Sequence, residues 1–198
     1  MENRCPSLTT PNLLVRLFEL KDAATLRETL KNTRDSLLPW IPWAVDEPEP
    51  LNVKEAKIRK WKGEYYLDLN YAYGIFSGDG SKLIGGAFMF TRQGPGILEI
   101  GYWITHEECG KGYATEVSYA LTKLGFEHIG IEKIEIHCNS DHKASARIPE
   151  KLGYKLESEN RRLEKKKDGA RIRFMVWVMF REEFRINPSY EPVTFTIE

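Results

Sequence analysis

The sequence has few cysteines, no excess of charge of either sign and no long hydrophobic run. Its cysteines, Cys5, Cys109 and Cys138, are too few and too widely spaced for a disulfide framework or a structural zinc site, which favours a reducing compartment. Lysine plus arginine and aspartate plus glutamate both count 29 in 198 residues. This balance argues against a protein that binds nucleic acid through bulk positive charge.

Targeting and membrane-spanning segments are also missing. The first residues, MENRCPSLTTPN, lack the apolar core of a signal peptide. No apolar run approaches the roughly 18 residues of a spanning helix. We therefore expect a cytoplasmic protein without a membrane partner. The length fits one domain, residues 1–185, followed by a proline-containing tail, residues 186–198, that we expect to be loosely held.

Hydrophobic patterning predicts strands and helices in a mixed order. The expected strands are Leu13–Leu20, Tyr71–Phe76, Lys82–Arg92, Ile97–Ile104, Lys133–Cys138, Tyr154–Glu164 and Arg171–Phe180. Two helices capped by Asp22 and Asn52 flank the proline-rich loop Leu38–Pro50, a third helix follows Gly112, and a fourth covers Lys143–Lys151. This order predicts an α/β (α+β) fold with a mixed, mostly antiparallel sheet of about seven strands and about four flanking helices.

A glycine-rich turn connects the strand Ile97–Ile104 to its helix. The turn reads Cys109-Gly110-Lys111-Gly112-Tyr113-Ala114-Thr115-Glu116. Its glycines permit a tight turn with exposed N–H groups, and the helix N-terminus adds about half a positive charge, so the segment suits a pyrophosphate. It is not a P-loop, because Tyr113 follows Gly112, and Thr115 weakens a dinucleotide fingerprint. A glycine-rich helix entry without a ligand is the alternative.

A second polar segment follows the strand Lys133–Cys138. Asn139 at the strand end, followed by a short helix, would present side chains into a cleft beside the anion site. The alternative is an ordinary helix capped by Asp141.

Together the two segments resemble the GNAT acetyltransferases. Gly110–Glu116 (GKGYATE) precedes an Asn…Ser…Glu-Lys-Leu-Gly-Tyr segment as it does in that family. Leu38–Ala44 (LPWIPWA) and Glu99–Ile104 (EIGYWI) are similar to its RimJ/RimL-like branch of ribosomal-protein N-terminal acetyltransferases. The resemblance implies direct transfer of an acetyl group from the co-substrate acetyl-CoA to a primary amine in a ternary complex. The implied acceptor is a protein or peptide N-terminal α-amine, with ribosomal proteins among the candidates.

The resemblance also implies roles for individual residues. Tyr102, Trp103 and Ile104 match the strand that pairs with the pantetheine arm, and Cys109 to Thr115 match the loop that holds the pyrophosphate. Cys109 stands where the family has Gln or Arg, and His142 stands where the branch has a cofactor-contacting Asn. Ser145 matches a serine near the thiol that would protonate the departing thiolate. These assignments, with Asn139, make up the expected cofactor site.

A general base must take a proton from the acceptor ammonium, because only a neutral amine attacks a thioester. Glu164 resembles the glutamate proposed for this role in the branch, although it also fits a solvated side chain in the charge-rich run Arg161–Asp168. Glu99 is the rival, and a structural or water-relay role for it is equally open. A mechanism with no single base is the third possibility.

Other chemistries are disfavoured. An acyl-cysteine mechanism at Cys109 or Cys138 lacks an evident histidine–carboxylate partner, and the four histidines show no metal-binding spacing. Trp40 and Trp43 are equally compatible with the lip of an acceptor pocket and with the core. Two other functions stay open: acetylation of a small amine such as a polyamine or antibiotic, and a non-catalytic acetyl-CoA-binding regulatory module. A homodimer is expected on general grounds alone.

Overall fold

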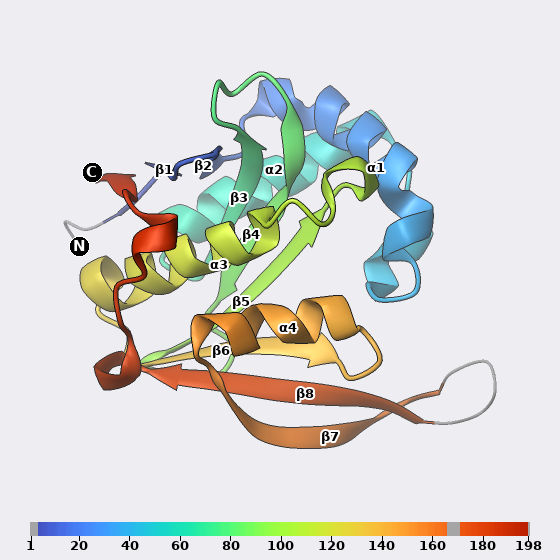
Figure 1. The fold of residues 1–198 in the computed structure, drawn as a ribbon. Coiled ribbons are helices and arrows are strands. Elements are labelled where there is room, and N and C mark those ends of the chain that lie inside the picture. The colour runs from blue at the N-terminus through green and yellow to red at the C-terminus, as the bar shows by residue number, and fades with distance from the viewer. Residues whose placement is uncertain (1–3, 166–170, 198) are drawn as a thin grey trace.

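The computed structural model describes residues 4–165 and 171–197. These residues form one nine-stranded sheet in the order β7-β8-β6-β5-β4-β3-β2-β1-β9 (Figure 1). The strands are β1 (Ser7–Thr9), β2 (Leu13–Leu17), β3 (Asn70–Ser77), β4 (Leu83–Phe90), β5 (Ile97–Ile104), β6 (Lys133–Asn139), β7 (Lys155–Lys165), β8 (Arg171–Phe180) and β9 (Thr194–Thr196). The pair β5–β6 is parallel and the other neighbours are antiparallel, so the predicted mixed sheet is confirmed.

Four α-helices cover the two faces of the sheet (Figure 1). They are α1 (Ala23–Leu37), α2 (Leu51–Tyr66), α3 (Tyr113–Leu124) and α4 (Lys143–Leu152). Helices α1 and α2 enclose one buried cluster with Trp103, whereas α3 belongs to the other, with Val117 and Leu121 at helical spacing. The α1/α2 face and the α3/α4 face are the two sides of the sheet on which the site is built.

Asp22 and Asn52 were predicted to cap the first two helices, and the structure places only Asp22 directly before its helix. Asp22 does precede α1, but its carboxylate accepts the N–H of Glu19 and the guanidinium of Arg16 rather than an N–H of α1. The prediction of Asn52 as the second cap is wrong, because α2 begins at Leu51 behind Pro50. Proline has its φ fixed near the helical value, so it leads into a helix without a side-chain cap.

The C-terminal segment is attached to the sheet, so the expectation of a loosely held tail is wrong. β9 pairs with β1, in the register Ser7 to Thr196. The carboxylate of Glu191 accepts hydrogen bonds from Tyr119, at 2.8 Å, and from Lys123 on α3. Strands β1 and β9 have three residues each, and β9 is an edge strand that pairs with β1, so local patterning did not reveal them.

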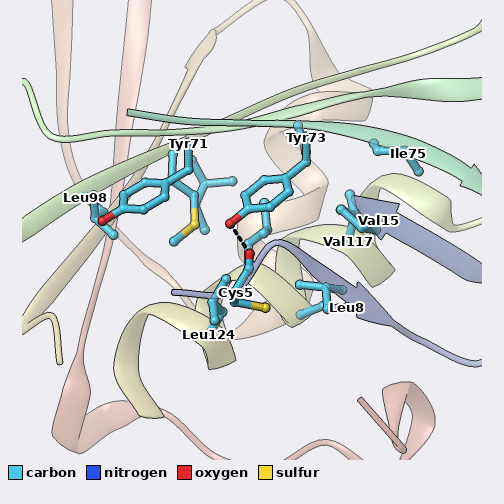
Figure 2. Close-up of a cluster of buried hydrophobic side chains, with 14 of the residues drawn as sticks. Cys5, Leu8, Val15, Tyr71, Tyr73, Ile75, Leu98, Val117 and Leu124 are labelled. Carbon is cyan, nitrogen blue, oxygen red and sulfur yellow. Dashed lines mark hydrogen bonds between the residues drawn. The ribbon is translucent and has the colours of Figure 1, made fainter. Parts of the chain in front are cut away.

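The core between the sheet and α3 reaches back to the N-terminal segment (Figure 2). The Tyr73 hydroxyl donates a hydrogen bond to the Cys5 carbonyl oxygen at 2.9 Å, amid Val15, Ile75 and Val117. Burial raises the pKa of the Cys5 thiol to about 12, so this cysteine packs as a small apolar residue. No helix among the described residues is long and apolar enough to cross a membrane.

Candidate functional site

The parallel strands β5 and β6 separate halfway along their length. They pair from Ile97 opposite Lys133 to Ile100 opposite Ile136, and no pairing joins Gly101–Ile104 to the end of β6 within the described residues. Each strand is still held by its outer neighbour, β5 by β4 and β6 by β8. The backbone N–H and C=O groups that would have completed the parallel ladder therefore face a gap. An extended ligand arm can form hydrogen bonds with them there.

A cleft of about 620 Å³ opens at this gap. Its walls come from β5 and β6, the segment between β5 and α3, the end of α1 with the following loop, and α4. Every predicted cofactor-site residue except Lys111 lines it: Tyr102, Trp103, Ile104, Cys109, Gly110, Gly112, Tyr113, Ala114, Thr115, Asn139, His142 and Ser145. The fold thus brings residues from distant parts of the sequence to one place.

The glycine-rich turn has the geometry of an anion site. Gly110 and Gly112 have φ angles of +82° and +90°, which glycine adopts without strain, and Gly112 directly precedes α3. The Gly112 carbonyl oxygen accepts the N–H groups of Thr115 and Glu116 at 3.0 Å each. Among the described residues, no backbone carbonyl accepts the N–H groups of 110–114. These N–H groups at a helix N-terminus fit a pyrophosphate.

Buried carboxylates hold this turn in place. Glu116 in the first turn of α3 accepts the Asn12 N–H at 2.8 Å, its side-chain amide at 3.0 Å and the Thr10 hydroxyl, which fixes α3 to the β1–β2 turn. Glu108 accepts Lys82 at 2.7 Å and Lys111 at 2.8 Å, and these hydrogen bonds lower its pKa. The Lys111 ammonium is therefore engaged beside the turn rather than inside the cleft.

Neither cysteine of the cleft is activated as a nucleophile. The Cys109 thiol donates to the Thr105 carbonyl oxygen at 3.4 Å, and burial raises its pKa. Burial likewise raises the pKa of the Cys138 thiol on β6. A thiol with a raised pKa is seldom present as the reactive thiolate, so an acyl-cysteine step has no support here.

Strand β5 sends alternate side chains to the two sheet faces beside the gap. The Tyr102 hydroxyl lies 3.3 Å from Ser145 Oγ on α4, and burial raises the pKa of Tyr102 well above its ordinary value. Trp103 points the other way, into the α1/α2 cluster. A Cβ on Gly86 would lie 2.5 Å from Trp103 Nε1, so this packing requires glycine in β4.

The segment between β6 and α4 closes one end of the cleft. The Asn139 side-chain oxygen accepts the Asp141 N–H at 3.0 Å, and His142 precedes the first residue of α4. The alternative of a helix capped by Asp141 is not what the structure has, because the residue before α4 is His142 and no described side chain caps the helix. The His142 ring stacks on Trp40, with ring centroids 4.1 Å apart and planes 5° apart, and burial lowers the pKa of His142. Trp40 thus lies on the cleft, whereas the Trp43 side chain does not line it and is 40% exposed.

Of the two candidate bases, Glu99 and Glu164, the structure describes the side chain of Glu99 alone. Glu164 lies in β7, but its side chain is outside the described residues. Glu99 is buried and accepts Arg92 on both carboxylate oxygens and Gln93 at 2.7 Å. Burial alone would raise the pKa of Glu99, but the hydrogen bond from Arg92, the nearby His137 and the hydrogen bond from Gln93 bring it below the ordinary value. A carboxylate held in this way is a poor proton acceptor.

His137 is a cleft residue with ionisable chemistry that was not predicted from the sequence. His137 on β6 lines the cleft and lies close to Glu99 and Glu135. Strand alternation does place residues 133, 135, 137 and 139 on one face, but His137 was considered only as a possible metal ligand. Among the described residues, no group of three or more His, Cys, Asp or Glu side chains is arranged to hold a metal ion.

Comparison with known proteins gives the family. The GNAT acetyltransferase domain matches residues 12–155. The chain belongs to the GNAT acetyltransferases. It is 30% identical over 153 residues, 76% of this chain and 81% of the relative, to a Bacillus subtilis (strain 168) protein named ribosomal N-acetyltransferase YdaF. As a family member it is an acetyl-CoA-dependent acetyltransferase, which confirms the predicted class of enzyme.

Solved GNAT structures share the fold. Mycobacterium smegmatis RimJ, in complex with CoA-disulfide, has a TM-score of 0.77 and 20% identity, covering 90% of this chain and 88% of its own. The microcin C7 self-immunity acetyltransferase MccE, in complex with acetyl-CoA and AMP, has a TM-score of 0.76 and 17% identity, covering 86% and 93%. At these identities the likeness concerns the fold.

Proposed function

We propose that the protein transfers the acetyl group of acetyl-CoA to the α-amine at a protein or peptide N-terminus. The observation that carries this proposal is the separation of β5 from β6 directly beside the turn at Gly110–Ala114. The turn would bind the pyrophosphate, and the free backbone of Tyr102–Ile104 would bind the pantetheine arm. Acetyl-CoA supplies the activated acetyl thioester.

Three groups of residues would complete the co-substrate site. Ser145, with the Tyr102 hydroxyl 3.3 Å from its Oγ, would give a proton to the departing thiolate. Asn139 and His142 would border the arm where β6 leads into α4. Arg147 on the outer wall of the cleft would meet an outer phosphate. Glu164 is the base that the family resemblance implies, and its side chain lies outside the described residues.

The charge of the cleft favours a peptide over a polyamine. A polyamine has several ammonium groups and needs several unpaired carboxylates to bind it. Within the described part of the chain, Glu108 is the one carboxylate that lines the cleft, and Lys82 and Lys111 already bind it. The name of the Bacillus subtilis relative points to ribosomal proteins as acceptors. Such an acceptor would be met in the cytoplasm, the location that we propose for this protein; a homodimer stays a prediction.

The test is intact-mass analysis of amines incubated with the protein and acetyl-CoA. The panel contains peptides that begin with Ser, Ala, Thr or Met, the same peptides blocked at the α-amine but carrying an internal lysine, spermidine and an aminoglycoside. We expect one acetyl increment on unblocked peptides alone. An acetyl increment on spermidine or the aminoglycoside would show that the acceptor is a small amine and would contradict the proposed peptide acceptor.

Binding of acetyl-CoA is tested separately by thermal unfolding. A co-substrate at about 100 times its Kd should stabilise the fold by about 2.7 kcal/mol. Stabilisation without acetylation of any amine would favour the regulatory binding module, and no stabilisation would contradict the co-substrate site itself.

A further inference from the structure

A histidine lies between two buried carboxylates at the point where β5 and β6 separate. His137 Nε2 lies 2.6 Å from Glu135 Oε2, and His137 Nδ1 lies 3.7 Å from Glu99 Oε2. Glu99 and Glu135 are partners in the parallel register and are 4% and 6% exposed. His137 lines the cleft, and the two carboxylates lie behind it.

Each of the two buried carboxylates has a cation beside it in addition to the histidine. Two like charges opposite each other on neighbouring strands are destabilising unless cations offset them. Glu99 has Arg92 on both oxygens, and Glu135 has the Lys133 ammonium at 2.9 Å. Lys133 is shared with the more exposed Glu157, whose Oε2 lies 3.1 Å from the same ammonium. Each of the two buried carboxylates thus has a cation other than the imidazole within ion-pair distance.

The hydrogen bonds leave one ring nitrogen of His137 available. An ionised carboxylate can only accept, so Nε2 donates its hydrogen to Glu135. The 3.7 Å from Nδ1 to Glu99 is too long for a hydrogen bond, and no other described residue bonds to Nδ1. Nδ1 can therefore accept a proton, and Glu99 then lies where it stabilises the imidazolium. From β8, the residue opposite His137 is the uncharged Val176.

The position of His137 suits an amine that approaches from the α1/α2 face. It is the first residue of β6 beyond the last β5–β6 pair, beside the gap that would hold the thioester. Its neighbour Cys138 points to the opposite face of the sheet, where Ser145 and Tyr102 lie. A proton acceptor and a proton donor thus flank the gap on opposite sides.

Resting on the acetyl transfer proposed above, we propose that His137 is the catalytic base for the acceptor amine, with Glu135 and Glu99 as positioning residues. The ammonium gives one proton to Nδ1. The neutral nitrogen then forms the N–C bond to the acetyl carbonyl carbon as the C–S bond breaks and its electron pair goes to sulfur. The second proton of the nitrogen ends on sulfur through Ser145, and His137 releases the first to water.

The decisive variant is His137→Gln, compared with His128→Gln as a matched control. His128 packs against Phe195 away from the cleft. At neutral pH we expect His137→Gln to lower kcat about 100-fold or more on the peptide that the wild type acetylates best. Acetyl-CoA affinity and the unfolding midpoint should change no more than in the control. The deficit should shrink as pH rises past about 8, where α-amines lose their proton without help.

Two more variants separate His137 from its rivals. Glu135→Gln keeps an oxygen that accepts from Nε2 but removes a charge, so the acidic limb of kcat/KM should move to lower pH. Glu164→Gln should keep the wild-type limb. An unchanged limb in His137→Gln, with the limb lost in Glu164→Gln, would overturn His137 and leave acetyl transfer intact. A wild-type protein inactive on every amine would overturn both proposals.

Discussion

The two sides of the β5–β6 gap are made of different chemical groups. On the α3/α4 face the site consists of backbone N–H groups at Gly110–Ala114 and two hydroxyls, those of Tyr102 and Ser145. On the α1/α2 face it consists of ionisable side chains around His137. A diphosphate can be bound by the backbone of one short segment, whereas proton transfer needs side chains from several strands.

The loop that borders the α1/α2 side also depends on buried charge. This loop, Leu38–Pro50, carries Trp40 and contains a 3-10 turn, Pro42–Asp46. Lys54 of α2, 2% exposed, binds Glu47 and, at 2.8 Å, Glu49. The acceptor side should therefore respond to changes of charge, and the co-substrate side to changes of backbone conformation.

Lys54→Met should have the largest effect on stability. It leaves the buried Glu47 carboxylate without its cation, which costs about 3–5 kcal/mol. Urea unfolding should show a much lower midpoint, and the folded protein should keep its affinity for acetyl-CoA. The control is Lys57→Met, because Lys57 also binds Glu49 but is far more exposed and should cost about 1 kcal/mol or less. Equal losses in the two variants would contradict the importance of burial.

Gly112→Ala should act on the co-substrate side. At a φ of +90° a side chain costs about 1–2 kcal/mol of strain, which a shift of the turn would relieve at the expense of binding. Acetyl-CoA affinity, measured by calorimetry, should fall roughly 5–30-fold. Gly94→Ala is the matched control, since Gly94 has a φ of +113° in the β4–β5 turn and open space around it. An equal loss of acetyl-CoA affinity in Gly94→Ala would contradict a specific role of the Gly112 conformation in binding.

Glu99→Gln should change the pH dependence of stability. The folded-state pKa of Glu99 is lowered, so its ionised form stabilises the fold above the unfolded value, about 4.3, and this contribution disappears as pH falls through the folded pKa. The free energy of unfolding should thus decrease more steeply with acid in the wild type than in Glu99→Gln. If the free energies of unfolding of the two proteins ran parallel from pH 7 to acidic pH, the ionised form of Glu99 would not stabilise the fold.

Tyr102→Phe should have the smallest effect. It removes a contact of 3.3 Å between two hydroxyls, worth about 0.5–1.5 kcal/mol, while the backbone of β5 stays in place. Turnover should drop several-fold at unchanged acetyl-CoA affinity. Tyr154→Phe is the control, because its hydroxyl bonds to Thr122 at 2.6 Å in the core, away from the cleft. A loss of turnover in both variants would assign the effect to packing.

Much of the fold and one half of the site could be predicted from local sequence. The meander β3–β5 follows from alternation and glycine-containing turns, and the turn at Gly110–Ala114 was recognisable from its own glycines and the helix after it. The cap Asn52 was predicted wrongly, because α2 begins at Leu51 directly after Pro50 and has no side-chain cap. The alternative cap Asp141 was not found either, because His142 precedes α4.

The sequence by itself determined the elements, the glycine turn and the family resemblance, because each of these depends on residues close together in the chain. Tertiary structure alone decided the pairing of β9 with β1 and the meeting of Glu99, Glu135 and His137. The register between β5 and β6 is set across a long crossover through α3, and a one-residue slip would turn His137 away from the cleft. No local pattern encodes that register, which depends on how α3 packs on the sheet.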